Sequence, residues 1–132
     1  MPEVNVWAVL AAGVASMALG GLWYSPALFG NAWMRASGMT EARARSANMA
    51  KVMGTAFALA VIGAAVFAMF LGPRPAPGFA AAAGLSAGLC WVAGSFGINY
   101  LFEQRPWRLF AINGGYHTVQ YTLIGLILGL WH

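Results

Sequence analysis

Four long apolar runs, separated by short connections, constrain this chain more than any other feature of its sequence. A run of about 20 apolar residues forms a helix of about 30 Å, the thickness of the hydrocarbon core of a bilayer. Only 8% of the residues are charged, whereas a water-soluble domain has about 25%. We therefore expect an all-α integral membrane protein, a single domain over residues 1–132 with four transmembrane helices in a compact bundle. The expected spans are residues 4–24, 52–71, 79–102 and 108–131.

A shorter helix is expected between the first two spans, over residues 26–37. Ser25 and Pro26 are typical of a helix start, and Gly38 is typical of a helix end. Because this helix is too short to cross a bilayer, we expect it to be amphipathic and to lie in the membrane interface. Thr40 then caps a further helix, which is expected to run without a break into the second span.

The basic residues are distributed unevenly between the connections. Six of the seven lie between spans one and two or between spans three and four, and only Arg74 lies in the remaining connection. By the positive-inside rule the two basic connections are cytoplasmic, so both termini are expected outside, in a multi-pass protein of the cell (inner) membrane. The basic residues form no stripe with polar spacers, which excludes a nucleic-acid partner and favours an anionic membrane surface.

The last span carries an ionisable side chain, His117, well inside its apolar run. Asn113, Gln120 and Tyr121 lie three or four residues from His117, so a helix places them all on one broad face. Bare polar groups in hydrocarbon cost roughly several kcal/mol each, so this face is expected to meet other helices or a water-filled cavity. Matching depths along the spans add side chains from two other helices. The candidate binding cluster is therefore Ser16, Trp91, Asn99, Asn113, His117, Gln120 and Tyr121.

Two interpretations of His117 remain open. It can form a ligand or proton site, because imidazole donates, accepts and exchanges protons near neutral pH. It can equally be structural, as a neutral ring that hydrogen-bonds a neighbouring span. No carboxylate lies inside any expected span, which disfavours a cation pump or a proton-coupled carrier. The two histidines and the single cysteine lack metal-site spacing, so we expect no metal, no cofactor and no catalytic residue.

Aromatic and basic side chains gather near the expected cytoplasmic interface. This combination is typical of the belt that anchors membrane spans. The alternative is a pocket for a lipid headgroup or an amphiphile beside the arginines. The expected anchors are Trp23, Tyr24, Phe29, Trp33, Arg35, Arg105, Trp107 and Arg108.

Small residues recur every four positions in the last two spans and let other helix backbones approach closely. The pairs are Gly84 with Gly88 and Gly125 with Gly129. We expect these stripes to hold a homo-oligomer or a larger membrane complex together, within the lipid bilayer.

Several short motifs resemble those of a known family of small four-span membrane proteins. The first half of the chain carries Gly21-Leu22-Trp23-Tyr24-Ser25-Pro26, Phe29-Gly30, Trp33-Met34 and Ser37-Gly38-Met39-Thr40. The second half carries Asn99-Tyr100-Leu101-Phe102-Glu103 and Asn113-Gly114-Gly115-Tyr116-His117. The chain resembles the domain-of-unknown-function family DUF1761, found mainly in bacteria and also in fungi. The resemblance implies a membrane protein and brings no established activity, substrate or cofactor.

The sequence contains small-residue stripes and no catalytic constellation. We therefore expect a non-enzymatic scaffold or accessory subunit that associates with itself or with a larger membrane complex. The alternative is a small transporter or channel-like protein, with a polar pathway centred on His117. A membrane enzyme is a more distant third interpretation.

Overall fold

The computed structural model describes residues 4–132, which form only helices, turns and loops. The first three residues of the expected domain lie outside this range. The helices are α1 (Val6–Trp23), α2 (Gly30–Ser37), α3 (Glu41–Ser46), α4 (Met49–Leu71), α5 (Pro77–Ser86), η1 (Ala87–Ala93), α6 (Gly94–Phe102) and α7 (Trp107–Leu130). The backbone of η1 is π-helical, and α5, η1 and α6 together form one continuous helical run.

Three helical runs in the described part of the chain are long and apolar enough to cross a membrane. They are α1, α4 and the run from Pro77 to Phe102. At 24 residues α7 has the required length, but it is not among the three. Asn113, His117 and Gln120 lie within it, and these polar residues lower its mean hydropathy.

The connection between α1 and α4 departs from the expected pattern in two places. The helix expected from Pro26 begins only at Gly30, because residues 24–29 form a turn in which the Ser25 hydroxyl donates to the Leu22 carbonyl oxygen at 2.7 Å. Gly30 follows this turn closely, and a Cβ there would meet the backbone oxygens of Tyr24 and Ser25. The Ser25 side chain therefore closes α1 and does not cap α2.

The helix expected to run from Thr40 into the second span is interrupted. Thr40 caps α3 as predicted, accepting from the Arg43 backbone N–H at 3.2 Å. The chain is then extended at Ala47, and the Asn48 side chain starts α4 by accepting from the Lys51 N–H at 3.2 Å. A second capping residue so close to the first gives two helices because each cap satisfies a new set of free N–H groups.

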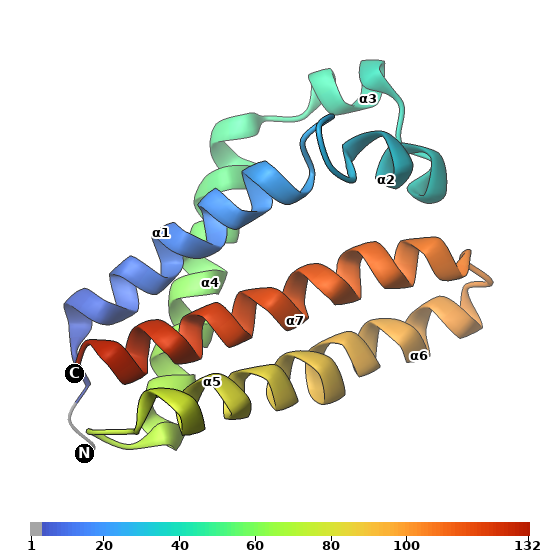
Figure 1. Cartoon of the computed structure of the whole chain (residues 1–132). Coiled ribbons are helices and arrows are strands. Elements are labelled where there is room, and N and C mark those ends of the chain that lie inside the picture. Colours follow the sequence, from blue (N-terminus) through green and yellow to red (C-terminus); the bar gives the residue numbers. More distant parts are fainter. Residues whose placement is uncertain (1–3) are drawn as a thin grey trace.

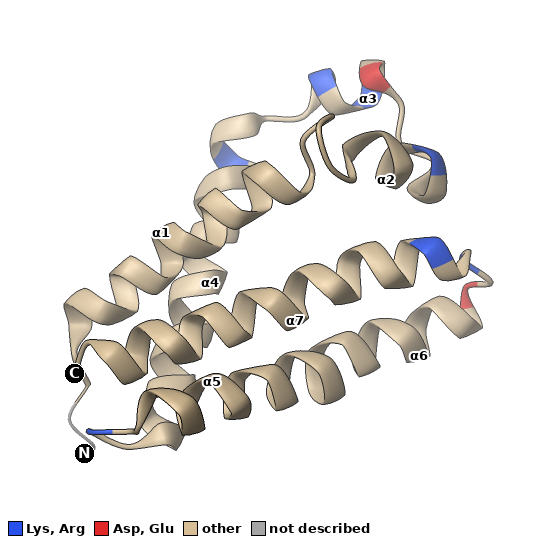
Figure 2. Cartoon of the chain, viewed as in Figure 1, with Lys and Arg blue, Asp and Glu red and all other residues tan. Residues whose placement is uncertain are grey.

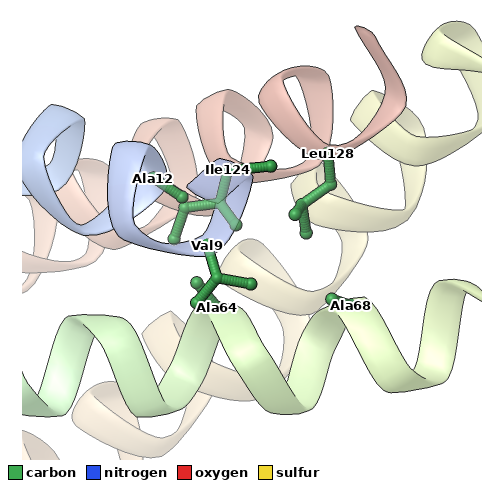
Figure 3. Close-up of a cluster of buried hydrophobic side chains, with 7 residues drawn as sticks. Val9, Ala12, Ala64, Ala68, Ile124 and Leu128 are labelled. Carbon is green, nitrogen blue, oxygen red and sulfur yellow. The ribbon is translucent and has the colours of Figure 1, made fainter. Parts of the chain in front are cut away.

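Helix α7 runs through the middle of the bundle (Figure 1). It packs antiparallel to the α5–η1–α6 run on one side and against α1 on another, while α4 packs mainly on α1. Small and branched side chains from α1, α4 and α7 form a buried cluster where these three helices meet (Figure 3). It contains Ala8, Val9, Ala12, Ala64, Ala68, Ile124 and Leu128.

Four glycines bring the backbones of the α5–η1 run and α7 together. A Cβ on Gly84 would meet the Tyr121 carbonyl, and one on Gly88 would lie 2.6 Å from the His117 carbonyl oxygen. A Cβ on Gly125 would likewise meet the Ala80 carbonyl, and one on Gly129 would lie 2.6 Å from the Pro77 Cα. The two stripes expected to serve an oligomer are therefore both buried in the interface between the α5–η1 run and α7 of one chain.

The charged side chains mark the two ends of the bundle differently (Figure 2). We call the end with α2, α3 and the α6–α7 connection the basic end. We call the opposite end, with the start of α1, the end of α7 and Arg74, the terminal end. Arg105 links two parts of the basic end by donating to the Ser37 carbonyl oxygen at 3.3 Å. The basic end carries Arg35, Arg43, Arg45, Lys51, Arg105 and Arg108.

Candidate functional site

Polar and aromatic side chains from α1, α6 and α7 meet in the half of the bundle nearer the basic end. The end of α1 supplies Trp23 and its C-cap residue supplies Tyr24, while α6 and α7 supply the remaining members. We call this group the polar-aromatic cluster. Its members are Trp23, Tyr24, Phe96, Tyr100, Asn113, Tyr116, His117 and Gln120.

Asn113 joins three helical segments through one side chain. Its Oδ1 accepts from the Tyr24 hydroxyl at 2.6 Å. Its Nδ2 donates to the Tyr100 hydroxyl at 2.8 Å. The carboxamide thus uses both its acceptor and a donor between helices, which an aliphatic side chain of similar size cannot do.

Two further hydrogen bonds connect α1 to α7 on either side of Asn113. The Trp23 Nε1–H donates to the Ile112 carbonyl oxygen at 2.9 Å, and the Tyr116 hydroxyl donates to the Ser16 carbonyl oxygen at 2.8 Å. Buried indole and phenol groups usually find such partners, because an unpaired donor in an apolar environment is costly. Trp23 is therefore an interhelical contact.

His117 lies between aromatic rings and beside a buried amide. Its ring stacks on Phe96 with centroids 5.2 Å apart and an interplanar angle of 11°, and the Tyr116 ring meets its edge at 4.8 Å. Its Nδ1 lies 2.7 Å from Gln120 Oε1. Because an amide oxygen only accepts, this contact makes Nδ1 the donor in the neutral ring. Gln120, only 6% exposed, holds the imidazole in one tautomer.

The Nε2 atom of His117 is the remaining acceptor of the neutral ring. No hydrogen bond to it is recorded among residues 4–132, and every fully buried side-chain nitrogen or oxygen in the same range has a partner. Nε2 is therefore not fully enclosed. It is the one atom of this ring that remains available to a small ligand or to water.

The structure does not bring all the candidates from the sequence into this cluster. Trp91 is 73% exposed, and Asn99 is also exposed on the outer side of α6. The Ser16 hydroxyl bonds the Ala12 carbonyl oxygen of its own helix at 2.8 Å, so only its backbone takes part. Tyr121 points toward α4, where its ring meets Phe67 edge-on at 5.9 Å.

Counting residues along the third span gives the depth of Trp91 and Asn99 but not the side of the helix on which they lie, and the π-helical segment η1 shifts that side. A π-helical turn holds more residues than an α-helical turn, so η1 changes which residues of α6 face α7. Tyr100 is the residue that reaches Asn113, while its neighbour Asn99 points outward. Nothing in the hydrophobic pattern reports this change of phase.

Three members of the cluster were missed from the sequence, namely Phe96, Tyr100 and Tyr116. Phe96 is apolar and carries no polar signal, and the two tyrosines were named only as parts of motifs. A signal for the tyrosines was present, because both belong to the family motifs Asn99-Tyr100 and Asn113-Gly114-Gly115-Tyr116-His117. The motif residues of α1, α6 and α7 meet in space, which a list of depths alone does not predict.

The expected anchors divide into an inner and an outer group. Trp33 packs edge-on against Tyr24 with centroids 5.7 Å apart, and Phe29 packs against Trp23 at 4.8 Å. Trp107 is 73% exposed, and the Arg108 guanidinium lies 5.9 Å from its ring centre. Arg35, Arg105 and Arg108 all lie at the basic end.

Across residues 4–132, no group of three or more His, Cys, Asp or Glu side chains is placed to share a metal ion. The chemistry that the cluster supports is hydrogen bonding between helices and, at Nε2 of His117, acceptance of one further hydrogen bond.

These observations define a small helical protein with three helical runs that are long and apolar enough to span a membrane, and with polar side chains that mostly pair between helices. A family model described as "Protein of unknown function (DUF1761)" matches residues 7–129, so the chain belongs to the DUF1761 family, as its motifs predicted. No curated protein matched the chain, and no solved structure did.

Proposed function

We propose that this protein is a non-enzymatic scaffold or accessory subunit of the inner membrane, built from four spans. The observation that carries this proposal is that the polar side chains of α7 have partners, most of them on neighbouring helices. Asn113, Tyr116 and His117 all hydrogen-bond or stack with neighbouring side chains or backbone. This favours a structural role, in which the cluster holds helices together, over a transport pathway.

The fourth proposed span is α7, despite its lower hydropathy. Its polar residues between Asn113 and Gln120 make hydrogen bonds inside the bundle. A helix with such partners does not present bare polar groups to lipid. Four spans place the two basic connections on one side, which the positive-inside rule assigns to the cytoplasm, with the termini outside. In this arrangement α2 lies in the cytoplasmic interface.

Association with another membrane protein needs a surface other than the glycine stripes. A groove of about 320 Å³ lies between α4 and the α5–η1 run, and we assign association to it. Phe70 is 84% exposed there, Phe79 63% and Trp91 73%. Large aromatic side chains are enriched where a partner helix packs. A partner span lying in this groove would cover α4, the least buried of the three apolar spans.

Cys90 lines the groove and provides the test, because it is the only cysteine of the chain. A benzophenone attached to Cys90 through a maleimide is expected, on illumination of native membranes, to give a protein–protein adduct. The matched control carries Cys90→Ser and Val14→Cys, which moves the label to an outward position on α1, 60% exposed. Adducts with lipid alone at Cys90, or equal protein adducts at both positions, would contradict the proposal.

The alternative is the small carrier or channel-like protein, favoured only by the accessible Nε2 of His117. It requires that His117→Ala change the uptake or proton flux of reconstituted liposomes. The scaffold proposal predicts that the parent and His117→Ala liposomes both match protein-free liposomes. Flux that depends on His117 would replace the scaffold with the carrier.

A further inference from the structure

A second cavity lies between α6 and α7 where they approach their connection, and it meets the polar-aromatic cluster only at Tyr100. Its volume is about 270 Å³. Gly97, Leu101 and Phe110 form its apolar wall, while Arg105 and Trp107 stand at the basic end of the cavity. The site therefore combines a hydrocarbon-lined space with a cation at one end.

The apolar part of this cavity is open to the surroundings of the helices. Leu101 is 79% exposed, Trp107 73% and Phe110 38%. Gly97 leaves the α6 wall bare, and a Cβ there would lie 3.0 Å from Cε1 of Phe110. A flexible hydrocarbon chain can fill an open apolar space of this kind, and the cation at one end distinguishes this cavity from the groove beside α4.

The polar end of the cavity carries donors that are not fully used. Arg105 Nε lies 3.4 Å from Glu103 Oε1, and one terminal nitrogen donates to Ser37. A guanidinium has five N–H donors, so the contacts recorded among residues 4–132 leave several for another acceptor. Arg108, the second residue of α7, has its guanidinium 5.9 Å from the Trp107 ring centre and no ion pair within the described residues.

We infer that this cavity binds one anionic phospholipid, with an acyl chain along Gly97, Leu101 and Phe110 and the phosphate group at Arg105 and Arg108. The basic end supplies the complementary charge, because it holds six basic side chains against the carboxylates Glu41 and Glu103. Basic pockets between membrane helices are a recurring type of site for anionic headgroups. Trp107 lies beside Arg108, and an indole side chain favours the headgroup region of a bilayer.

The test measures lipid retained by the purified full chain, using native mass spectrometry. The probes are phosphatidylglycerol and phosphatidylcholine with identical acyl chains. We expect the parent to retain phosphatidylglycerol about 25-fold more strongly, because each of the two arginines near the headgroup provides about fivefold. Equal retention of the two lipids by the parent would overturn the inference.

Charge variants locate the headgroup. Arg105→Gln and Arg108→Gln should each reduce the preference for phosphatidylglycerol, while Arg74→Gln removes one charge at the terminal end and should not. Arg108→Gln separates a loss of lipid binding from a loss of folding. Among residues 4–132 the Arg108 side chain makes no hydrogen bond or ion pair, whereas Arg105 bonds the Ser37 carbonyl oxygen. An equal reduction in the Arg74 variant would mean that net charge alone attracts the lipid and would overturn the site.

Two further arms test the acyl-chain part. Gly97→Leu fills the cavity and should weaken retention of phosphatidylglycerol, whereas Gly94→Leu, with nothing within 4 Å of its Cβ, should not. Inorganic phosphate at the same concentration should not displace the bound lipid. Displacement by phosphate, or equal retention by both glycine variants, would show that the hydrocarbon wall is not used and would contradict the inference.

Discussion

The two ends of this bundle hold their helices together in different ways. At the terminal end, α1, α4 and α7 meet through small side chains such as Ala12, Ala64 and Ala68, and glycines bring α5 against α7. Toward the basic end, α1, α6 and α7 are joined by aromatic rings and hydrogen bonds centred on Asn113. Lipid tails are as apolar as the side chains, so burying apolar side chains between helices gives little hydrophobic free energy. Membrane helices therefore associate by close packing or by polar contacts. This chain uses one of these means at each end.

Each kind of contact requires a different distance between the helices. Close packing needs small residues on both helices and tolerates no extra atom, as the Gly84 and Gly125 contacts with backbone carbonyls show. Aromatic and polar side chains instead bridge a wider gap, as the Trp23 and Tyr24 side chains do between α1 and α7. Figure 1 shows α1 and α7 diverging toward the end where these longer side chains lie.

The largest effect is expected from adding one methyl group at the closely packed interface. In Gly84→Ala the new Cβ would meet the Tyr121 carbonyl, so α5 and α7 must separate. Overpacking of this kind costs about 1–3 kcal/mol of the free energy of unfolding, occasionally more. The measurement is the midpoint of thermal unfolding in detergent. Gly94→Ala, which has open space around its Cβ, is the control. Similar midpoints for the two variants would contradict the packing.

An intermediate effect is expected at the centre of the polar-aromatic cluster. Asn113→Leu removes two interhelical hydrogen bonds and leaves the hydroxyls of Tyr24 and Tyr100 without their partner. We expect a loss of about 1–2 kcal/mol, measured in the same unfolding assay. Asn99→Leu is the matched control, since Asn99 is exposed, and it should leave the midpoint unchanged or raise it. If Asn99→Leu were the more damaging variant, α6 would be turned differently from the arrangement described.

The smallest effect is expected from removing a single hydroxyl group. Tyr116→Phe loses the bond to the Ser16 carbonyl oxygen, worth about 0.6 kcal/mol between membrane helices. Tyr121→Phe loses a hydroxyl with no hydrogen bond recorded among residues 4–132, and its ring stays against Phe67. The expected order of unfolding midpoints is parent and Tyr121→Phe together, then Tyr116→Phe. A lower midpoint for Tyr121→Phe than for Tyr116→Phe would contradict a stabilising contribution from the Tyr116–Ser16 hydrogen bond.

The local features of the fold were largely readable from the sequence. Thr40 and Gly38 cap helices as predicted, because their effects act on backbone groups within four residues. Asn48 was missed as a second cap, although it acts by the same local rule. The clustering of Asn113, His117 and Gln120 on α7 also follows from helical spacing.

The amino-acid sequence alone predicted a helical protein of the DUF1761 family with four membrane spans; the helices and the family are confirmed, and three helical runs of the described residues are apolar enough to span a membrane. These properties depend on composition, on helical period and on short motifs, all of which are local. Two features became visible only in the folded chain. Gly84 of α5 packs on α7 and Gly125 of α7 packs on α5, and Tyr100 rather than Asn99 meets Asn113. The physical reason is that helix phase and helix partner depend on the π-helical turn of η1 and on packing between distant segments, and neither leaves a mark on the pattern of hydrophobic residues.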